Sequence, residues 1–423
     1  MKDLLNLRFR TNQVMKVEEI RQMFPALSQE VYGKKLVYFD NAATSQRLSS
    51  VIECQKDCAL GANANIHRAV HKLAVEATKA YEDTRDAVKS FLNVGSRDEI
   101  IFTSGTTHSI NLAASCFGNA FVNPGDEVIV SESEHHSNIV PWQLMCNRRG
   151  ATLRVLPVDN DGHLLVDLLE GMLSERTKIL AVTQISNVLG IRNPIERIVS
   201  ICHSKGCKVL VDGAQGAVHG GIDVQETGCD FYAFSGHKVY AATGVGVLYG
   251  KKELLEAMPP YMGGGEMIDH VRFSGTTYAP LPEKFEAGTQ NFLSVPTLRP
   301  ALEFAQEVNK DAEVQARQKE IIDYLLDKLG NSPEIRLFGV PRGTEEKIPL
   351  FSFCVEGVHH EDLALILDKM GIALRSGQMC AEPLMDRFGV TGMLRASIAP
   401  YNTMEEAEYF VKCLDKAAKM LRA

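Results

Sequence analysis

Two side chains of this sequence are suited to covalent chemistry. Lys238 ends the segment Ser235–Lys238, and Cys380 lies in a glycine-containing loop five residues after Arg375. A lysine amine can form a Schiff base, and a thiol can act as a nucleophile. Together they predict chemistry that takes sulfur from an amino acid. Cys380 alone would indicate little, because the chain has ten cysteines.

Polar residues at the ends of other predicted strands can complete a site around Lys238. Asp212 and Gln215 follow an apolar run, and Lys238 comes 26 residues after Asp212. Sites in open α/β sheets form outside the carboxyl ends of strands. An aspartate on one strand end and a lysine on a later one suit pyridoxal 5'-phosphate. The lysine amine binds the cofactor, and the aspartate keeps the pyridine nitrogen protonated, which makes the ring an electron sink.

Further residues near predicted strand ends suit a phosphate and an aromatic ring. Thr106 and Thr107 follow a glycine at a helix start, where backbone N–H groups and hydroxyls can bind a phosphate. Ser235 and His237 lie beside the lysine and can donate to the same phosphate. His135 follows another predicted strand, and its ring can lie over the cofactor and move protons.

Each of these residues alone has an ordinary alternative. Asp212 can be a helix N-cap, Lys238 a solvated side chain, and His135 a turn residue beside another histidine. The Gly-Thr-Thr segment is a common helix entry. The joint arrangement, with every member near a strand end, favours the cofactor site over these alternatives.

Short apolar runs alternate with helical segments through the middle of the chain. This pattern predicts an α/β fold with a mostly parallel sheet of about seven strands and helices on both faces. We expect residues 245–249 to close the sheet as an antiparallel edge strand. The other predicted strands are residues 99–103, 127–131, 152–156, 178–183, 208–211 and 230–234.

The C-terminal part of the chain predicts a second, smaller α+β unit. Residues 295–329 have the pattern of one long helix that leaves the sheet domain. We expect a large cofactor-binding domain at residues 36–299, and a small domain, made of residues 1–35 and 300–423, that carries the Cys380 loop. Its predicted strands and helices are residues 350–355, 361–370, 372–375 and 403–421.

Composition limits the class of protein. The chain has 423 residues, 45% of them apolar, and a formal charge of -8. No long basic stripe is present, so we expect no nucleic-acid partner. Scattered cysteines are typical of a reduced compartment, and they do not form a zinc-binding pattern with histidines, so we expect no metal. Without a secretory signal or an apolar run of about 18 residues, we expect a soluble, cytoplasmic protein that binds no membrane.

Eight segments form a specific combination: FDNAA (39–43), IHR (66–68), EHHSNIVPW (134–142), SNVLG (186–190), VDGAQ (211–215), FSGHK (234–238), FEAGT (285–289) and RAS (395–397). They resemble the fold-type-I pyridoxal-phosphate enzymes of the class V aminotransferase group. Within that group, the chain resembles the group II cysteine desulfurases of the Suf system from about Val17 to the C-terminus. The resemblance implies the pyridoxal-phosphate transferase fold, with a large and a small domain.

The resemblance also implies roles for the cofactor-binding residues. Lys238 would carry the Schiff base, and His135 would stack on the ring. Asp212 would pair with the pyridine nitrogen, and Gln215 would hydrogen-bond the phenolic oxygen. The phosphate ligands implied at the helix start and the lysine segment are Thr107, with Thr106 beside it, Ser235 and His237. In this family a threonine of the FEAGT segment reaches the phosphate of the neighbouring subunit, so Thr289 implies a homodimer.

The implied reaction is removal of sulfur from L-cysteine. Asn187 and Arg395 would hold the substrate carboxylate, with Arg375 close by. Cys380 would attack the substrate sulfur, which would leave a persulfide and release L-alanine. The sulfur would then be passed on for iron–sulfur cluster assembly. His67 would lie at the site entrance, although a structural role for this residue is equally consistent with the sequence.

The cysteine loop departs from many relatives. They read Arg-x-Gly-His-His-Cys-Ala, whereas Gln378 and Met379 replace both histidines here. The loop is also short, with Cys380 five residues after Arg375 and Pro383 soon after it. A short loop reaches less far than the longer insertion of group I enzymes, so we expect a small sulfur-acceptor protein of the Suf system as partner.

Two other functions fit parts of the sequence. A selenocysteine lyase, or another β-eliminating or transaminating enzyme, would use the same cofactor without a strict need for Cys380. A protein that has kept the fold only as a scaffold would need neither Lys238 nor Asp212. Retention of all three residues favours the desulfurase.

Overall fold

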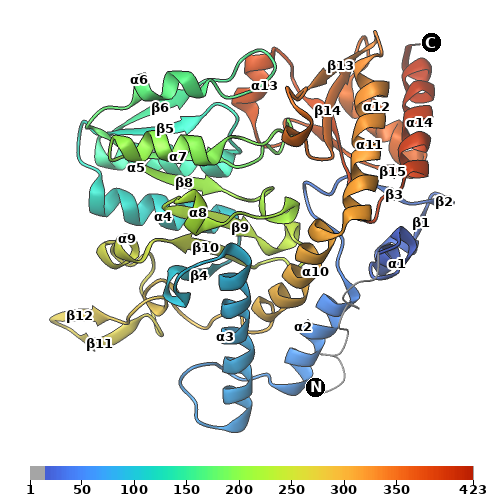
Figure 1. Cartoon of the computed structure of the whole chain (residues 1–423). Helices are drawn as coiled ribbons and strands as arrows, with labels where there is room; N and C mark the ends of the chain where they lie inside the picture. Colours follow the sequence, from blue (N-terminus) through green and yellow to red (C-terminus); the bar gives the residue numbers. More distant parts are fainter. Residues whose placement is uncertain (1–14, 423) are drawn as a thin grey trace.

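The structure is a computed structural model that describes residues 15–422 (Figure 1). The first fourteen residues of the expected small domain lie outside this range. No helix within it is long and apolar enough to cross a membrane. All ten cysteines lie within the described residues and carry free thiols.

A seven-stranded sheet forms the centre of the larger unit, in the order β4-β10-β9-β8-β7-β5-β6. The strands are β4 (Ile100–Thr103), β5 (Glu127–Ser131), β6 (Thr152–Leu156), β7 (Thr177–Thr183), β8 (Lys208–Asp212), β9 (Phe231–Ser235) and β10 (Gly246–Gly250). β10 is antiparallel to both of its neighbours, and the other six strands share one direction. The predicted α/β fold with a mostly parallel sheet is therefore confirmed.

The predicted position of β10 is wrong. The strand is antiparallel, as expected, but it lies between β4 and β9 and not at the edge. All five of its residues are buried and none is charged, which is typical of a central strand. Its first glycine lets β10 approach the loop before α4, because a Cβ on Gly246 would lie 2.4 Å from the Cα of Gly105.

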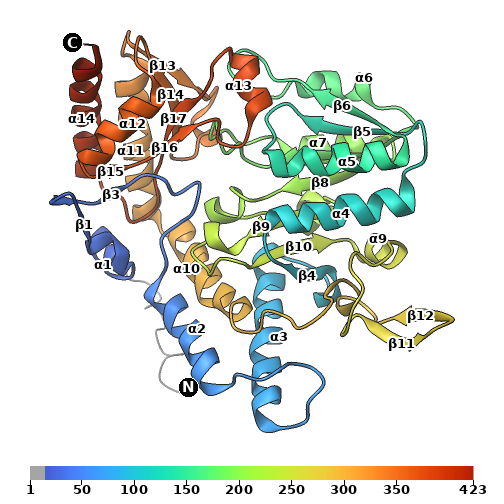
Figure 2. The ribbon, with the colours of Figure 1, turned by 180° about the vertical axis from the view of Figure 1, so that it is seen from behind.

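Helices cover both faces of this sheet because alternate residues of each central strand point to opposite cores. On β8, Val209 and Val211 belong to one apolar cluster and Leu210 to the other. α7 and α8 lie over the face seen in Figure 1, and α4 and α5 over the face seen in Figure 2. These helices and their neighbours are α3 (Lys72–Leu92), α4 (Thr106–Phe121), α5 (Val140–Arg149), α6 (Leu169–Met172), α7 (Ile195–Ser204), α8 (Val224–Thr227) and α9 (Lys252–Ala257).

The C-terminal unit has its own antiparallel sheet and its own core. Its strand order is β13-β14-β17-β16, and one apolar cluster joins this sheet to α11, α12 and α14. The elements are β13 (Ile335–Phe338), β14 (Leu350–Val355), α12 (His360–Lys369), β15 (Ile372–Ala373), β16 (Arg375–Gly377), α13 (Glu382–Phe388), β17 (Met393–Ser397) and α14 (Met404–Arg422).

The N-terminal segment also contacts the C-terminal unit. β3 (Val37–Tyr38) pairs in parallel with β15, and Phe39 packs in the C-terminal cluster, although the sequence assigns these residues to the large domain. The remaining elements are α1 (Val17–Gln22), β1 (Glu30–Val31), β2 (Lys34–Lys35), α2 (Ser49–Gly61) and the exposed hairpin of β11 (Ile268–Arg272) and β12 (Gly275–Tyr278).

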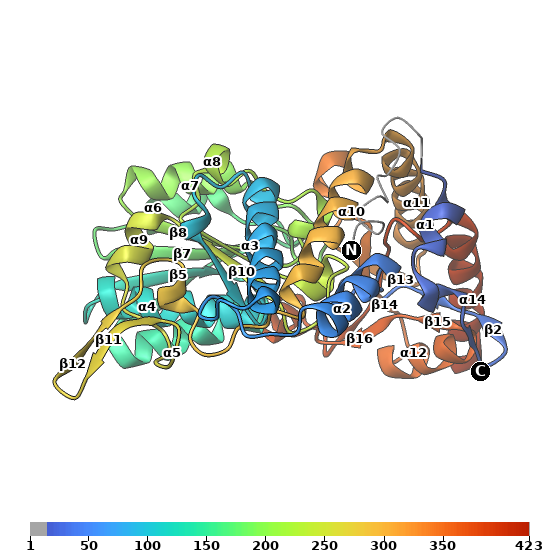
Figure 3. The same ribbon diagram turned by 90° about the horizontal axis from the view of Figure 1, so that it is seen from below.

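The single long helix predicted for residues 295–329 is two helices, α10 (Leu298–Lys310) and α11 (Ala312–Gly330). The break is at Asp311, whose carboxylate accepts hydrogen bonds from the backbone N–H groups of Glu313 and Val314 and so caps α11. α10 packs with the core of the large sheet, whereas α11 packs with the C-terminal core. Figure 3 shows α10 between the two units.

Candidate active site

Asp212 and Lys238 lie at the ends of two neighbouring strands. Asp212 is the last residue of β8, and Lys238 ends a single turn that follows β9. Asp212 is 3% exposed, and its Oδ1 accepts a hydrogen bond of 2.9 Å from the backbone of Ala214. Burial raises the pKa of this carboxyl, while Lys238 opposes that shift. Burial likewise lowers the pKa of Lys238 to about 8, with Asp212 raising it.

Two further predicted residues come close to this pair. Gln215 is buried, and its Nε2 donates to the carbonyl oxygen of Ala42 at 2.8 Å. His135 follows β5, and its Nδ1 accepts from the backbone N–H of Ser137 at 3.0 Å. Burial, then the charge of Lys238, lowers the pKa of His135 to about 3. The ring is therefore neutral at neutral pH.

Residue Glu134, which the sequence did not single out, supports the segment that carries His135. Its carboxyl is fully buried and accepts hydrogen bonds from Thr183 N–H at 2.7 Å and Asn138 Nδ2 at 2.6 Å. Burial raises its pKa to about 8. The EHHSN segment matched by resemblance was the available signal for this residue.

The predicted phosphate residues divide into two groups. Ser235 Oγ accepts from the backbone N–H of Thr106 at 2.8 Å and lies 2.7 Å from its hydroxyl, at the start of the 16-residue helix α4. Thr107 is exposed at the same helix start. His237 instead lies beside Thr44, 3.3 Å from Nδ1 to Oγ1, and burial lowers its pKa to about 4.

Arg395 and Arg375 both contact Asp40. Arg395 is 3% exposed on β17, and one of its amino groups donates to the main-chain oxygen of Asn187 at 2.9 Å. Its other amino group lies 3.3 Å from Asp40, which also forms an ion pair of 2.8 Å with the more exposed Arg375. The buried Nε of Arg395 has no hydrogen-bond partner among residues 15–422.

Cys380 is exposed on a loop in which two consecutive residues, Met379 and Cys380, have φ near +54°. The Asn187 side chain donates to the Met379 carbonyl oxygen at 2.9 Å. His136, another residue missed from the sequence, donates from its backbone to the Cys380 carbonyl oxygen at 2.7 Å. Burial lowers the pKa of Lys238 and of Arg395, and a charge on Cys380 opposes both shifts. The loop therefore lies at the same site as the lysine.

The residues that stand where relatives carry two histidines have different contacts. Met379 is buried, and Gln378 Nε2 donates only to Glu382 Oε1, at 3.3 Å. Neither supplies an imidazole to the thiol.

Two other predicted residues are His67 and Thr289. His67 has a positive φ of 69°, and its Nε2 lies 3.7 Å from Glu82 on α3. Thr289 is exposed on the loop that follows Glu286.

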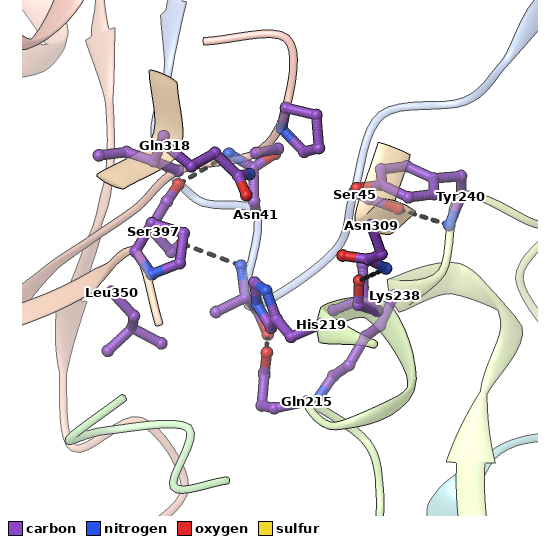
Figure 4. A pocket seen from close by; sticks show the side chains of 16 residues that line it. Asn41, Ser45, Gln215, His219, Lys238, Tyr240, Asn309, Gln318, Leu350 and Ser397 are labelled. Carbon is purple, nitrogen blue, oxygen red and sulfur yellow. Dashed lines mark hydrogen bonds between the residues drawn. The ribbon is translucent and has the colours of Figure 1, made fainter. Parts of the chain in front are cut away.

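A small cavity of about 20 Å³ lies beside Lys238 (Figure 4), which is enough for one water molecule. Polar side chains from both units line it, among them Asn41, Ser45, Gln215, His219, Tyr240 and Gln318. Burial lowers the pKa of His219 to about 3, so its ring is neutral.

This donor set fits pyridoxal phosphate. A buried carboxyl, that of Asp212, lies near the amine of Lys238, whose pKa is lowered to about 8. The pyridine nitrogen of the cofactor requires such a carboxyl, and its aldehyde requires such an amine. The start of α4 offers N–H groups and hydroxyls near Ser235, as a phosphate requires. Lys238, Asp212, Gln215, His135 and the α4 start are the residues that would hold it.

Comparison with known proteins agrees with this geometry. Residues 37–410 match the family model described as Aminotransferase class-V. The chain is 44% identical to a cysteine desulfurase of Pectobacterium carotovorum, over 96% of this chain and 98% of the relative. It is 45% identical to a probable cysteine desulfurase of Halalkalibacterium halodurans, over 95% and 98%.

Solved structures show the same relationship. The cysteine desulfurase CsdA from Escherichia coli superimposes with a TM-score of 0.88 at 41% identity, covering 96% of this chain and all of the other. The cysteine desulfurase from Thermococcus onnurineus superimposes with a TM-score of 0.89 at 33% identity, covering 97% and 99%. The chain thus belongs to the class V aminotransferase family of pyridoxal-phosphate-dependent enzymes and, within it, to the cysteine desulfurases.

Proposed function

We propose that this chain removes sulfur from L-cysteine, releases L-alanine and leaves a persulfide on Cys380. The observation that carries this proposal is the exposed Cys380 thiol, on a loop that accepts hydrogen bonds from Asn187 and His136. Electrons and atoms balance without another reactant. The thiolate forms a bond to the substrate sulfur, the carbon–sulfur bond breaks, and the carbon keeps the electron pair and takes a proton.

The residues have separate tasks in this reaction. Pyridoxal phosphate, when bound, withdraws electrons from the substrate carbon atoms. Arg395 binds the substrate carboxylate through its free Nε, and Asn187 holds both this arginine and the Met379 peptide. Lys238, with a pKa of about 8, can take and return a proton at neutral pH. His135 enters the reaction as a neutral base.

Substrate choice can be tested with two amino acids. Cys380→Ser should abolish alanine formation from cysteine and leave turnover of selenocysteine, because the weaker carbon–selenium bond needs less help from a nucleophile. Equal activity of the variant and the unchanged protein on cysteine would overturn the proposal. Equal loss on both substrates would give the thiol a wider role and exclude a selenocysteine lyase that works without it.

We infer that the enzyme is of the group II, Suf type and passes sulfur to a small acceptor protein. The support is the short loop, which is held at Met379 and Cys380 by residues of the large unit. Addition of a small acceptor protein bearing an exposed thiol should raise the rate of alanine formation under multiple turnover. An equal rate of direct transfer to a scaffold protein, with and without the acceptor, would contradict this inference.

We also propose that the protein is a homodimer. Each chain has the two-domain division expected from the sequence, and the protein acts in the reducing cytoplasm. The exposed position of Thr289 supports a dimer in which this residue serves the partner's phosphate site. Light scattering on the purified protein should give twice the chain mass. When Lys238→Ala and Thr289→Ala chains are refolded together, each mixed dimer should regain one intact site. A monomer that is fully active would contradict the proposal.

A further inference from the structure

His136 contacts the cysteine loop through both its backbone and its side chain. The backbone N–H donates to the carbonyl oxygen of Cys380 at 2.7 Å, and Nε2 accepts from the backbone N–H of Glu382 at 3.0 Å. The two contacts therefore lie on the two sides of the Cys380–Ala381 segment. Because a backbone N–H can only donate, the imidazole must be the tautomer that carries its proton on Nδ1.

The loop needs such contacts because its backbone is strained. Met379 and Cys380 both have φ near +54°, a left-handed conformation that costs energy for residues with a Cβ atom. Strain of this kind persists only where surrounding structure holds it. The contacts that hold it from the large unit come from Asn187, on the Met379 side, and from His136, on the Cys380 and Glu382 side.

The position of His136 in the chain links two parts of the site. It follows His135 directly, and the pair lies on a segment whose preceding residue, Glu134, is fully buried and bonded to β7 through Thr183. Movement of this segment is therefore restricted. His136 connects it to Glu382, the first residue of α13, whose residues Leu384 and Met385 are buried in the core.

We propose that His136 is a positioning residue for the Cys380 thiol. Its imidazole holds the first turn of α13, and with it the strained cysteine peptide, at the site that contains Lys238 and Arg395. This inference rests on the proposed function, in which Cys380 must reach the substrate sulfur. It assigns to His136 a contact with the loop only, and no contact with the substrate.

Two variants of the holoenzyme test it. His136→Leu removes the acceptor for the Glu382 N–H. His136→Gln is the matched control, because its side-chain oxygen can accept the same hydrogen bond. We expect His136→Leu to lower kcat for alanine formation roughly fivefold, the scale of one hydrogen bond, with KM and the cofactor absorbance unchanged. Hydrogen exchange at residues 378–388 should become faster in this variant. His136→Gln should restore both values towards those of the unchanged protein.

The outcomes separate this inference from the proposed function. Unchanged exchange at residues 378–388 in His136→Leu, or an equal loss of kcat in His136→Gln, would overturn the positioning role. Failure of the unchanged protein to make alanine would overturn the proposed function, while the exchange measurement would still report whether His136 holds the loop. If His136→Leu loses the cofactor absorbance, only His136→Gln is compared with the unchanged protein. Faster exchange at residues 378–388 in His136→Gln then counts against the role.

Discussion

Arg85 and Glu286 form an ion pair of 2.8 Å in which the two side chains are 1% and 3% exposed. The pair joins α3 to the loop that leads to Thr289. Glu286 also accepts from Tyr81 Oη at 3.0 Å and from the backbone N–H of Phe102 at 2.7 Å. Every oxygen of this buried carboxylate therefore has a donor, which is the condition under which a buried charge is tolerated.

Loss of Arg85 should destabilise the protein strongly. Arg85→Met leaves the Glu286 carboxylate buried without its cation, which costs about 3–5 kcal/mol of the free energy of unfolding. Urea unfolding measures this loss. The matched control is Arg97→Ala, because Arg97 pairs with Asp86 where the side chains are 45% and 51% exposed, and an exposed pair contributes at most about 1 kcal/mol. Similar losses in the two variants would contradict this account of the pair.

Replacement of Arg395 should weaken substrate binding. Arg395→Lys keeps the charge, but its three donors lie on one nitrogen and cannot reach Asn187, Asp40 and a carboxylate as the separate guanidinium nitrogens do. A hydrogen bond to a charged group contributes about 1.5–3 kcal/mol, so KM for cysteine should rise roughly ten- to hundredfold. The cofactor absorbance should not change. An unchanged KM with a lower kcat would mean that Arg395 does not bind the substrate carboxylate.

Three histidines with lowered pKa values should make the protein less stable in acid. The pKa is lowered to about 3 for His135 and His219 and to about 4 for His237, in each case chiefly by burial. Unfolded histidines bind protons near pH 6.5. Between pH 6.5 and about 4 the unfolded chain therefore binds more protons, and stability falls as the pH falls, by at most about 1.4 kcal/mol per pH unit for each histidine.

His219→Gln isolates one of these histidines, because His219 has no assigned part in the reaction. Thermal unfolding midpoints at pH 7, 6 and 5 should decrease less steeply in this variant than in the unchanged protein. Identical slopes would show that His219 is not held neutral by burial.

Cofactor uptake should report the ionisation of Lys238. In protein stripped of cofactor, covalent uptake of added pyridoxal phosphate requires the neutral amine, so its rate should rise with pH through about 8. Because Asp212 raises the lysine pKa, Asp212→Asn should move the midpoint to lower pH. Stopped-flow absorbance gives both values. A midpoint near that of a free lysine, about 10.4, would contradict the lowered pKa of Lys238.

The spacing of apolar residues and the polar residues at strand ends predicted the parts of this fold that depend on local sequence. Apolar runs such as residues 127–131 and 208–211 match β5 and β8, and the polar residues after them, Asp212 above all, do meet at one edge of the sheet. The position of β10 could not be predicted, because strand order depends on which neighbours pair across the chain. The break at Asp311 was hidden because the apolar period continues on both sides of the cap.

Site residues could be predicted from the sequence where the side chain itself is reactive. They could not be predicted where the role depends on a hydrogen-bond partner far away in the chain. Lys238 at a strand end indicated a Schiff base, and Cys380 in a loop indicated a nucleophile. Glu134 and His136 indicated nothing alone, because their parts depend on Thr183 and Glu382, which are distant in sequence. The side chain of Asn187, predicted to hold the substrate carboxylate, donates to the Met379 carbonyl oxygen, a contact that only the folded loop creates.

The central claim is that Cys380 receives the sulfur atom of the substrate. The most direct measurement is mass spectrometry of the peptide that contains Cys380, after a brief reaction of the holoenzyme with L-cysteine, together with the amount of alanine released. We predict one added sulfur atom on Cys380 and one alanine per active site in the first turnover, with neither in Cys380→Ser. Alanine formed in the first turnover with no sulfur on Cys380, or formed equally by Cys380→Ser, would contradict the account.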